Sequence, residues 1–595
     1  AAVLAFLPSG LLAAPQDSPP PPTPPGPWLR VESDHFTLFG DRPEEELLQT
    51  AIELERLRST LTLLAPGNRL DPYLPARLYL FRSATSFAPF RLPGAGSMDA
   101  GYLLETEEAS YGALVGGRPS YLILRQYVRD FLDRQLPGLP AWLRTGFAEY
   151  YGTFEADDTE ARIGLPSRRH LDVLSRRAEL IPTAELVAME APAGEEAAPT
   201  TGFDPAAEGP VAAGNEDIFA SFGPPTPFES QSWAAVHYLM GGDEGERRRL
   251  GDYIRRVVAA EDPLAAFRSA LGMEPVAFDR ALAEYVRGTT FSYLRVPVER
   301  SAKPLAAEPM TPAEVAYHLG DLLLHLGPSH RDGARQRLRR AVELDPGNGR
   351  AWAGLGRLHE AAGDDAATLE AYGKAVALLP DDAGVQVRYG QARLRSLGGR
   401  RASDEAGQAA VAAARGAFRR AAELRPGSGE AWAGLGQAGV LAAEPDPEAV
   451  AALERALELL PPGRADVLFN LLLARARVGD AAGVDRAIAD LRAAGADDTL
   501  LVRAREVRLQ LTLQEAHRLA TNDRLDDAVA LLAVVQAEST NPAVSEQAAA
   551  LFDKLERAER HNRFAEAYTE AVRLYHAGDL EAAAAAVEAM LAEAA

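Results

Sequence analysis

The stretch "AWAGLGRLHEAAGDDAATLEAYGKAVALLP", residues 351–380, decides the fold of the C-terminal half of this chain. It returns at residues 431–461 as "AWAGLGQAGVLAAEPDPEAVAALERALELLP". Self-similarity of this length indicates a repeat architecture in which each copy is one helical hairpin. Aromatic, small and proline residues recur in register. We expect these residues to pack the hairpins: Trp352, Gly356, Tyr372, Ala375 and Pro380 in one copy, and Trp432, Gly436, Ala456 and Pro461 in the other.

The prolines that close each copy set the period of the repeat. Pro346 and Pro380 are 34 residues apart, and Pro426 and Pro461 are 35 apart. The middle interval of 46 residues contains an insertion near "SLGGRRASDEAGQ". The period and the packing positions together resemble the tetratricopeptide repeat, which implies an all-α solenoid over residues 313–595. Because each hairpin exposes an apolar face that only a neighbour can bury, the hairpins are expected to stack.

The half before the repeats has mixed patterning. Short runs rich in aromatic and β-branched residues, "WLRVESDHFTLFG" and "ARLYLFRS", predict strands, and helical periodicity takes over from residue 123. We therefore expect an α+β domain over residues 28–300. Residues 191–228, rich in Pro, Gly and acid, predict a disordered insertion, and residues 301–312 predict a linker. The proline-rich residues 15–27 predict an extended linker before the domain.

One segment of this half, "ILRQYVRDFLDRQLPGLPAWLRTGFAEYY" at residues 123–151, has the pattern of a peptidase active site. With "VESDHFTLF", "MDAGYL", "RRHLDVL" and "ESQSWAAVHYLM", it resembles the MA-like, gluzincin-type peptidase domains. In that family a His-Glu-x-x-His helix and a Glu from the next helix hold zinc and activate water. The resemblance places Arg125 and Arg129 at the two histidines, Gln126 at the general base and Thr145 at the third ligand.

These four residues are a poor set for zinc. A guanidinium stays protonated and has no lone pair to donate, and Gln126 has no carboxylate that could accept a proton from water. We therefore expect a metal-free fold with no catalytic residue, no metal site and no cofactor. Three roles stay open for Arg125 and Arg129: solvated charge on a helix edge, a bridge to Glu149 in place of the metal, or capture of a ligand carboxylate.

The bulk properties limit the partners. The net charge of −23 disfavours nucleic acid, and the absence of cysteine excludes disulfides and thiol catalysis. The opening "AAVLAFLPSGLLAA", residues 1–14, resembles the end of a secretory signal peptide, which predicts export to the periplasm or cell envelope. No later segment is long and apolar enough to predict a transmembrane helix.

Together these features favour a non-catalytic scaffold protein of the bacterial cell envelope. It would bind a protein or peptide through the groove of its repeats and carry an inactive peptidase-like domain. Two alternatives stay open. One is a hydrolase or peptidase with relocated catalytic groups, for which the chain offers no G-x-S-x-G and no H-E-x-x-H motif. The other is a structural subunit of a larger envelope assembly.

Overall fold

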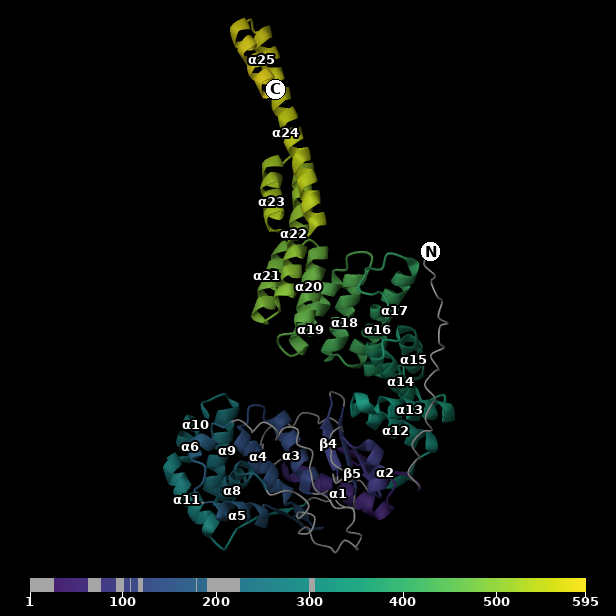
Figure 1. Ribbon diagram of the computed structural model, residues 1–595, viewed down its shortest axis with the longest axis vertical. Helices are drawn as coiled ribbons and strands as arrows, with labels where there is room; N and C mark the ends of the chain where they lie inside the picture. Colours follow the sequence, from purple (N-terminus) through teal and green to yellow (C-terminus); the bar gives the residue numbers. More distant parts are fainter. Residues whose placement is uncertain are drawn as a thin grey trace, which may run out of the picture. The chain divides into compact units, whose positions relative to one another are not determined.

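The structure, a computed structural model, describes residues 26–61, 76–92, 101–106, 109–115, 121–177, 179–189, 225–298 and 305–594. The chain forms two compact units, Ala1–Pro346 and Gly347–Ala595. Each unit is described by itself below (Figure 1). The segment predicted as a signal peptide, nearly all of the proline-rich segment, and the predicted insertion as far as residue 224 lie outside the described residues.

A six-stranded mixed sheet organises the N-terminal unit. Its strand order is β4-β5-β3-β2-β1-β9, in which β2 pairs with β3 and β3 with β5 in parallel, while the other neighbours are antiparallel. The strands are β1 (Leu29–Glu32), β2 (Phe36–Gly40), β3 (Ala76–Phe81), β4 (Gly101–Glu105), β5 (Ser110–Val115) and β9 (Ala307–Pro309). The α+β class predicted for this half is therefore confirmed.

One face of the sheet packs on the helices that follow β2 and β5. Leu38 and Leu78 are paired in the sheet, and both are buried with Leu54 of helix α1 (Glu44–Leu61) in one apolar core. Helix α3 (Tyr121–Gln135) adds Val128 and Phe131 to this core. Side chains alternate across a strand, so the residues that flank Leu38 on β2 and Leu78 on β3 point to the opposite face of the sheet. That face needs a second layer to bury it.

The second cover is the first helical hairpin, α12 (Pro312–His325) and α13 (Arg331–Leu344). The ring of His318 lies 4.0 Å from that of Phe39 on β2, and His325 stacks on Tyr111 of β5 at 4.2 Å. From α13, the guanidinium of Arg337 lies over the ring of Phe90. This hairpin, predicted as the start of the repeat domain, therefore belongs to the N-terminal unit.

The structure also corrects the prediction of a linker at residues 301–312. Over its described part, Ala307–Pro309 form β9, which pairs with Leu29–Val31 of β1. Thr311 then caps α12, where its hydroxyl accepts a hydrogen bond from the backbone N–H of Glu314. A strand of three residues is too short to display alternation, so its composition resembled that of a linker.

A buried polar contact fixes α12 to the sheet. Asp321 accepts a hydrogen bond from the hydroxyl of Tyr111 at 2.9 Å and from the guanidinium of Arg77 at 3.1 Å. The same Arg77 nitrogen donates to the Tyr111 oxygen at 2.8 Å. Asp321 is buried, and its two hydrogen bonds join α12 to β5 and β3.

The rest of the N-terminal unit is mostly helical. Helices α4 (Ala141–Gly152) and α8 (Pro227–Gly241) cross so closely that a Cβ on Gly146 would lie 2.4 Å from the carbonyl oxygen of Ser232. A small second sheet has the order β6-β7-β8. The elements are α2 (Ala84–Phe87), η2 (Ala88–Phe90), α4 (Ala141–Gly152), β6 (Glu155–Ala156), β7 (Glu160–Ile163), α5 (Arg168–Ser175), α6 (Thr183–Leu186), α8 (Pro227–Gly241), α9 (Glu244–Val258), α10 (Pro263–Leu271), α11 (Pro275–Arg287), β8 (Leu294–Pro297) and η3 (Pro328–His330). Helix α8 thus begins inside the range predicted as an insertion.

The C-terminal unit is entirely helical over its described residues, as predicted. Consecutive helices pair into hairpins, and neighbouring hairpins pack on one another (Figure 1). The helices are α14 (Gly349–Ala361), α15 (Asp365–Leu378), α16 (Ala383–Arg395), α17 (Glu405–Leu424), α18 (Gly429–Leu441), α19 (Glu448–Leu459), α20 (Ala465–Arg477), α21 (Ala481–Ala493), α22 (Asp498–Thr521), α23 (Leu525–Glu538), α24 (Pro542–His576) and α25 (Leu580–Ala594).

Close approach of two helices defines each repeat hairpin. A Cβ on Gly356 would lie 2.8 Å from the ring of Tyr372, and one on Gly436 would lie 2.3 Å from Cγ of Leu453. Ala375 and Ala456 are fully buried in the second helices of their hairpins. The prolines follow these helices, with Pro380 two residues after the end of α15 and Pro461 two after α19.

The two tryptophans of the repeats are only half-buried. Lys374 lies 4.1 Å from the ring of Trp352, and the indole N–H of Trp432 donates to the carbonyl of Pro426 at 3.0 Å.

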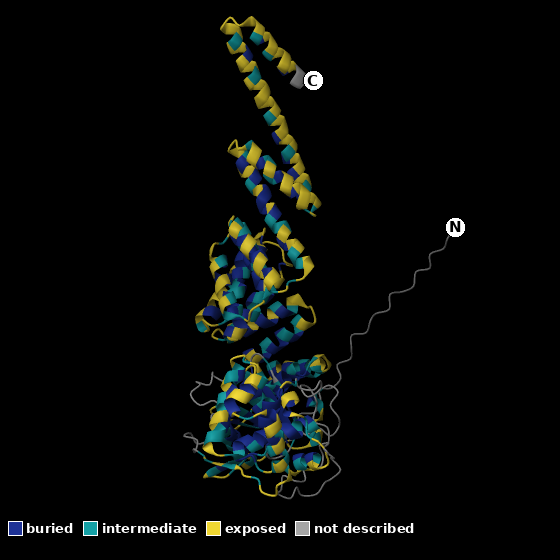
Figure 2. Ribbon diagram, turned by 90° about the vertical axis from the view of Figure 1, so that its left-hand side faces the viewer, coloured by how far each residue is buried: buried dark blue, intermediate teal, exposed yellow. Residues whose placement is uncertain are grey.

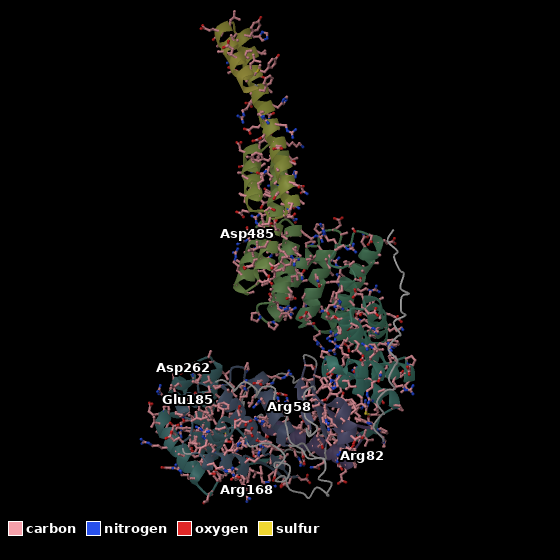
Figure 3. All side chains as sticks on the ribbon, in the orientation of Figure 1. Arg58, Arg82, Arg168, Glu185, Asp262 and Asp485 are labelled. Atoms are coloured by element: carbon pink, nitrogen blue, oxygen red, sulfur yellow. The ribbon has the colours of Figure 1, made fainter. Side chains whose placement is uncertain are left out.

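Charged pairs on the surface connect neighbouring hairpins. In one of these, Arg508 of α22 donates to Asp485 of α21, which is labelled in Figure 3. The tetratricopeptide-like packing therefore uses buried small residues inside and charges outside.

Removing the carboxylate of Asp321 should destabilise the N-terminal unit. In Asp321→Ala, half-buried Arg77 loses its counter-ion, which should cost about 2–3 kcal/mol, less than for a fully buried pair because part of the guanidinium stays hydrated. The measurement is the melting temperature of the full chain by calorimetry, with hydrogen exchange of β3 and β5. Asp332→Ala is the control on the same hairpin, because its pair with Arg335 is largely exposed and should change stability by less than about 1 kcal/mol. Equal effects of the two variants would contradict the role of Asp321.

A pair of glycine substitutions should act in opposite directions. Gly436→Ala places a methyl group against Leu453 and should cost about 1–3 kcal/mol through overpacking. Gly373→Ala, inside α15 with open space around the new methyl, should raise stability by about 0.5–1 kcal/mol because alanine favours helix. Urea denaturation of the full chain measures both, and a stabilised Gly436→Ala variant would contradict the close approach of α18 and α19.

Candidate functional site

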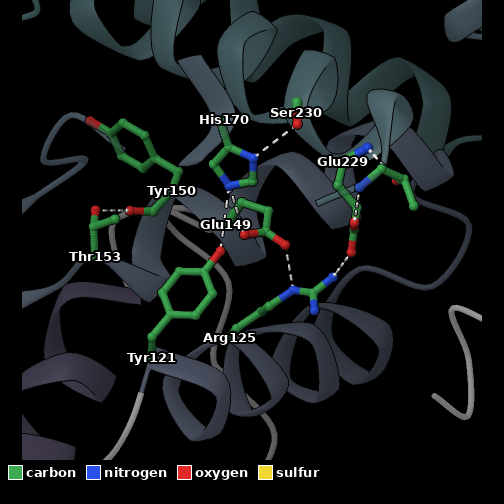
Figure 4. A network of polar contacts seen from close by, with 9 residues as sticks. Tyr121, Arg125, Glu149, Tyr150, Thr153, His170, Glu229 and Ser230 are labelled. Carbon is green, nitrogen blue, oxygen red and sulfur yellow. Dashed lines mark hydrogen bonds and ion pairs between the residues drawn. The ribbon is translucent and has the colours of Figure 1, made fainter. Parts of the chain in front are cut away.

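Four helices of the N-terminal unit carry the peptidase-like positions and the polar residues that Arg125 meets. Helix α3 carries Arg125, Gln126 and Arg129, and α4 carries Thr145 and Glu149. Helix α5 adds His170, and the start of α8 adds Glu229 and Ser230. Figure 4 shows Arg125, Glu149, His170, Glu229 and Ser230 converging between the helices, with Arg125 pointing from α3 toward the two glutamates. The site is therefore built from charged groups that come from distant parts of the chain.

Arg125 lies between two carboxylates. Its Nε is 2.5 Å from Oε1 of Glu149, and its Nη2 is 2.5 Å from Oε1 of Glu229 (Figure 4). The Glu149 side chain is 2% exposed and that of Glu229 13%, so both ion pairs are largely shielded from water. Arg125 is thus a cation that links α3 to α4 and α8, and the structure brings Arg125 and Glu149 together as the bridge hypothesis requires.

His170 extends the network on the other side of Glu149. Its Nε2 lies 3.0 Å from Oε2 of Glu149 and 3.5 Å from the hydroxyl of Tyr121. Its Nδ1 lies 3.3 Å from the hydroxyl of Ser230, and its ring stacks on Trp233 at 5.2 Å. Both ring nitrogens of His170 therefore have a hydrogen-bond partner.

Burial controls the charge states of these groups. It lowers the pKa of His170 to about 3, with further lowering by the positive charges of Arg169 and Arg125, so the imidazole is neutral at pH 7. Burial and the charge of Glu229 raise the pKa of Glu149, against the opposing effect of Arg169. Burial also acts to raise the pKa of Glu229. Arg125 and the hydrogen bonds from Thr226 outweigh it, and that pKa is lowered.

The remaining peptidase-like positions have other surroundings. Gln126 donates through Nε2 to Oδ1 of Asp130 at 2.7 Å, within the same helix. Arg129 lies one turn beyond Arg125 on α3 and is half-buried. Thr145 is buried at 1% exposure beside Gly146, where α4 meets α8. The bridge to α4 is thus made by Arg125, which contacts Glu149 directly.

The residues present do not fit the zinc ion that the resemblance implies. The position nearest the carboxylates is filled by a guanidinium, which has no lone pair and repels a divalent cation. Within the described part of the chain, no group of three or more His, Asp or Glu side chains is placed to hold a metal. Glu149, His170 and Glu229 could serve as donors by type, but the Arg125 side chain takes up both carboxylates.

Two members of the network were missed from the sequence. The sequence around His170 carries no local signal of its partners, because Glu149 and Ser230 lie 21 and 60 residues away. Glu229 carried a detectable signal, since Thr226-x-x-Glu229 is a capping box at the start of α8, with both reciprocal hydrogen bonds formed. That box orients the Glu229 carboxylate, and its second oxygen remains available for Arg125.

Comparison with solved structures finds proteins that contain tetratricopeptide repeats. YrrB, described as a TPR protein with an unusual peptide-binding site, is 17% identical with a TM-score of 0.28, over 32% of this chain and 91% of its own. A thermophilic TPR protein of Thermus thermophilus is 23% identical with a TM-score of 0.26, over 33% and 99%. PilF of Pseudomonas aeruginosa is 16% identical with a TM-score of 0.27, over 40% and 97%. No family model and no curated protein matches the sequence.

Neutralising Arg125 should destabilise the N-terminal unit. Arg125→Met leaves two buried carboxylates facing each other without a counter-ion, at a cost of about 3–5 kcal/mol. The triple variant Arg125→Met, Glu149→Gln, Glu229→Gln removes the uncompensated charge and should recover most of this loss. The measurement is the free energy of unfolding by chemical denaturation.

Arg248→Met is the matched control for that series. Its pair with Glu244 is exposed on both sides, so the substitution should stay within about 0.5 kcal/mol of the parent. An Arg125→Met variant as stable as the parent, or a triple variant no better than the single one, would show that the bridge does not hold the helices.

Proposed function

We propose that this chain is a non-catalytic, protein-binding scaffold. The stack of helical hairpins in the C-terminal unit carries the proposal. Each hairpin buries small residues inside and leaves polar helix surface in water, the arrangement by which repeat proteins present extended binding surfaces. The partner is a protein or peptide that contacts several hairpins. No prosthetic group or cofactor is part of the proposal.

The charge of one segment suggests the chemistry of the partner. Residues 383–403 contain five arginines and no acidic residue, within a chain of net charge −23. They cover α16 and the inserted loop of residues 396–404, where Arg400 and Arg401 are exposed. The loop is anchored to the next hairpin, because the backbone N–H of Ala402 donates to the carbonyl of Leu441. An acidic stretch of a partner protein is complementary to this segment.

The N-terminal unit is proposed to be an inactive peptidase-like module. The guanidinium of Arg125 takes both carboxylates that face the peptidase-like positions, and Gln126 offers an amide where a base is needed. The two buried ion pairs would replace the structural role of a metal by linking α3 to the following helices. Docking or rigid support is then the remaining role of this unit.

The proposed location is the cell envelope, in agreement with the apolar N-terminal sequence. Among the helices of the described segments, none has the length and apolar character needed to cross a membrane. Membership of a larger envelope assembly agrees with a scaffold role and would place the repeat surface against another subunit.

Affinity capture with cross-linking from the source cell envelope tests the proposal. The full chain should recover a protein whose yield falls at least tenfold with Arg400→Glu/Arg401→Glu, because the reversed charge repels an acidic segment. Arg486→Glu/Arg492→Glu is the control with the same charge change on α21, where both arginines are exposed. Equal yields with both variants would reject the arginine segment as the binding surface. Cleavage of casein that stops with chelator would overturn the non-catalytic assignment.

A further inference from the structure

One buried arginine of the N-terminal unit has two unpaired nitrogens. Buried residues fill the interior of this unit (dark blue in Figure 2), and few of them are charged. Two arginines are buried among the described residues, Arg58 at 5% and Arg337 at 4% exposure. Arg58 donates to the hydroxyl of Tyr127. In contrast, Nε and Nη2 of Arg337 are closed to water and have no hydrogen-bond partner in the described part of the chain.

The Arg337 side chain extends from α13 toward the residues that follow β3. Its Cβ lies beside α12, 3.2 Å from the position that a Cβ on Gly320 would take. Its guanidinium carbon lies 5.2 Å from the centre of the Phe90 ring, and Phe90 is fully buried in η2. An aromatic ring attracts the positive charge but provides no oxygen that could accept from the N–H groups. The guanidinium is therefore held in the interior with two of its donors unused.

The two unpaired nitrogens form one edge of the guanidinium. The N–H of Nε and one N–H of Nη2 point in the same direction, so this edge can donate two parallel hydrogen bonds. Two oxygens of a single carboxylate, phosphate or sulfate group match that spacing, which is the usual bidentate geometry of arginine. A single-atom anion such as chloride offers no second acceptor and should bind this edge less well.

The surroundings of this edge are positively charged. Burial lowers the pKa of Arg337 to about 10, and no carboxylate of the described residues opposes this effect, so the side chain keeps its proton at pH 7. The sequence of α13 contains five arginines against one aspartate and one glutamate. Nε of Arg91, the residue after Phe90, is also buried without a partner among the described residues. Positive charge therefore accumulates near an edge that needs a negative acceptor.

We propose that the Nε and Nη2 edge of Arg337 binds a small oxyanion, one with a carboxylate, phosphate or sulfate group, between α13 and η2. Two charge-assisted hydrogen bonds satisfy both buried nitrogens, and the negative charge balances the guanidinium. The bound anion also joins the first helical hairpin to the residues that follow β3, in addition to the contact that Asp321 makes. The site uses none of the residues around Arg125 and does not depend on the scaffold role.

Isothermal titration calorimetry of the full chain with inorganic phosphate, and separately with acetate, tests this site. At least one of the two should bind saturably with one site per chain, and the one that binds distinguishes phosphate from carboxylate chemistry. Arg337→Met should weaken that binding about tenfold or more, because it removes two hydrogen bonds from a charged donor. Arg337→Lys keeps the charge but loses the edge, so it should also bind more weakly than the parent.

Arg340→Met is the matched control on the same helix. It makes the same change of charge, and the pair of Arg340 with Glu343 is exposed on both sides, so this variant should bind like the parent. Sodium chloride, titrated in the same way, should give no saturable signal. Circular dichroism verifies that the variants keep their helices.

Hydrogen exchange measured with and without the oxyanion locates the site independently. The anion should slow exchange in α13 and in η2 of the parent, and it should have no such effect in Arg337→Met. A parent that binds neither oxyanion, equal binding by the parent and Arg337→Met, or protection confined to other parts of the chain would each overturn the proposal. Chloride that binds as tightly as the oxyanions would overturn it as well.

Discussion

A helical hairpin buries only part of its surface by itself, and this constraint organises the molecule. The hairpin of α12 and α13 resolves it by packing on the sheet, where Asp321 binds Tyr111 and Arg77. The hairpins that follow resolve it by packing on each other through glycine and alanine. On α24 and α25, seven large apolar side chains between residues 564 and 591 remain exposed.

The N-terminal unit faces a different problem, which is buried charge. Two carboxylates lie inside a helical core, and a guanidinium between them supplies the positive charge that burial requires. An arginine side chain supplies this charge without a bound ion that could dissociate, and the side chain itself fills the space between the carboxylates. The consequence is a junction in which Arg125 links α3 to α4 and α8 and occupies the space between the two carboxylates.

Much of the fold could be predicted from the sequence, because its signals are local. Repeat hairpins follow from Trp352, Gly356 and their counterparts, and the α+β class follows from short apolar strands. The strand β9 could not be predicted, since three residues are too few to show alternation and only their pairing with β1 makes them a strand. Neither could the cover of the sheet, because an apolar face on α12 does not reveal its partner. In the site, the resemblance singled out Arg125, and a bridge to Glu149 was one of three roles left open, whereas His170 and Glu229 reach these residues only through tertiary packing.

The position of β9 also affects how the protein is made. β1 lies between β2 and β9 in the sheet, so one of the first strands to leave the ribosome waits for residues 307–309 to complete its pairing. The other face of the sheet stays uncovered still longer, until α12 and α13 have been synthesised. At about 5–20 residues per second, this delay lasts on the order of tens of seconds. During that interval the nascent N-terminal half would display unpaired backbone and aromatic side chains, the type of surface that chaperones shield.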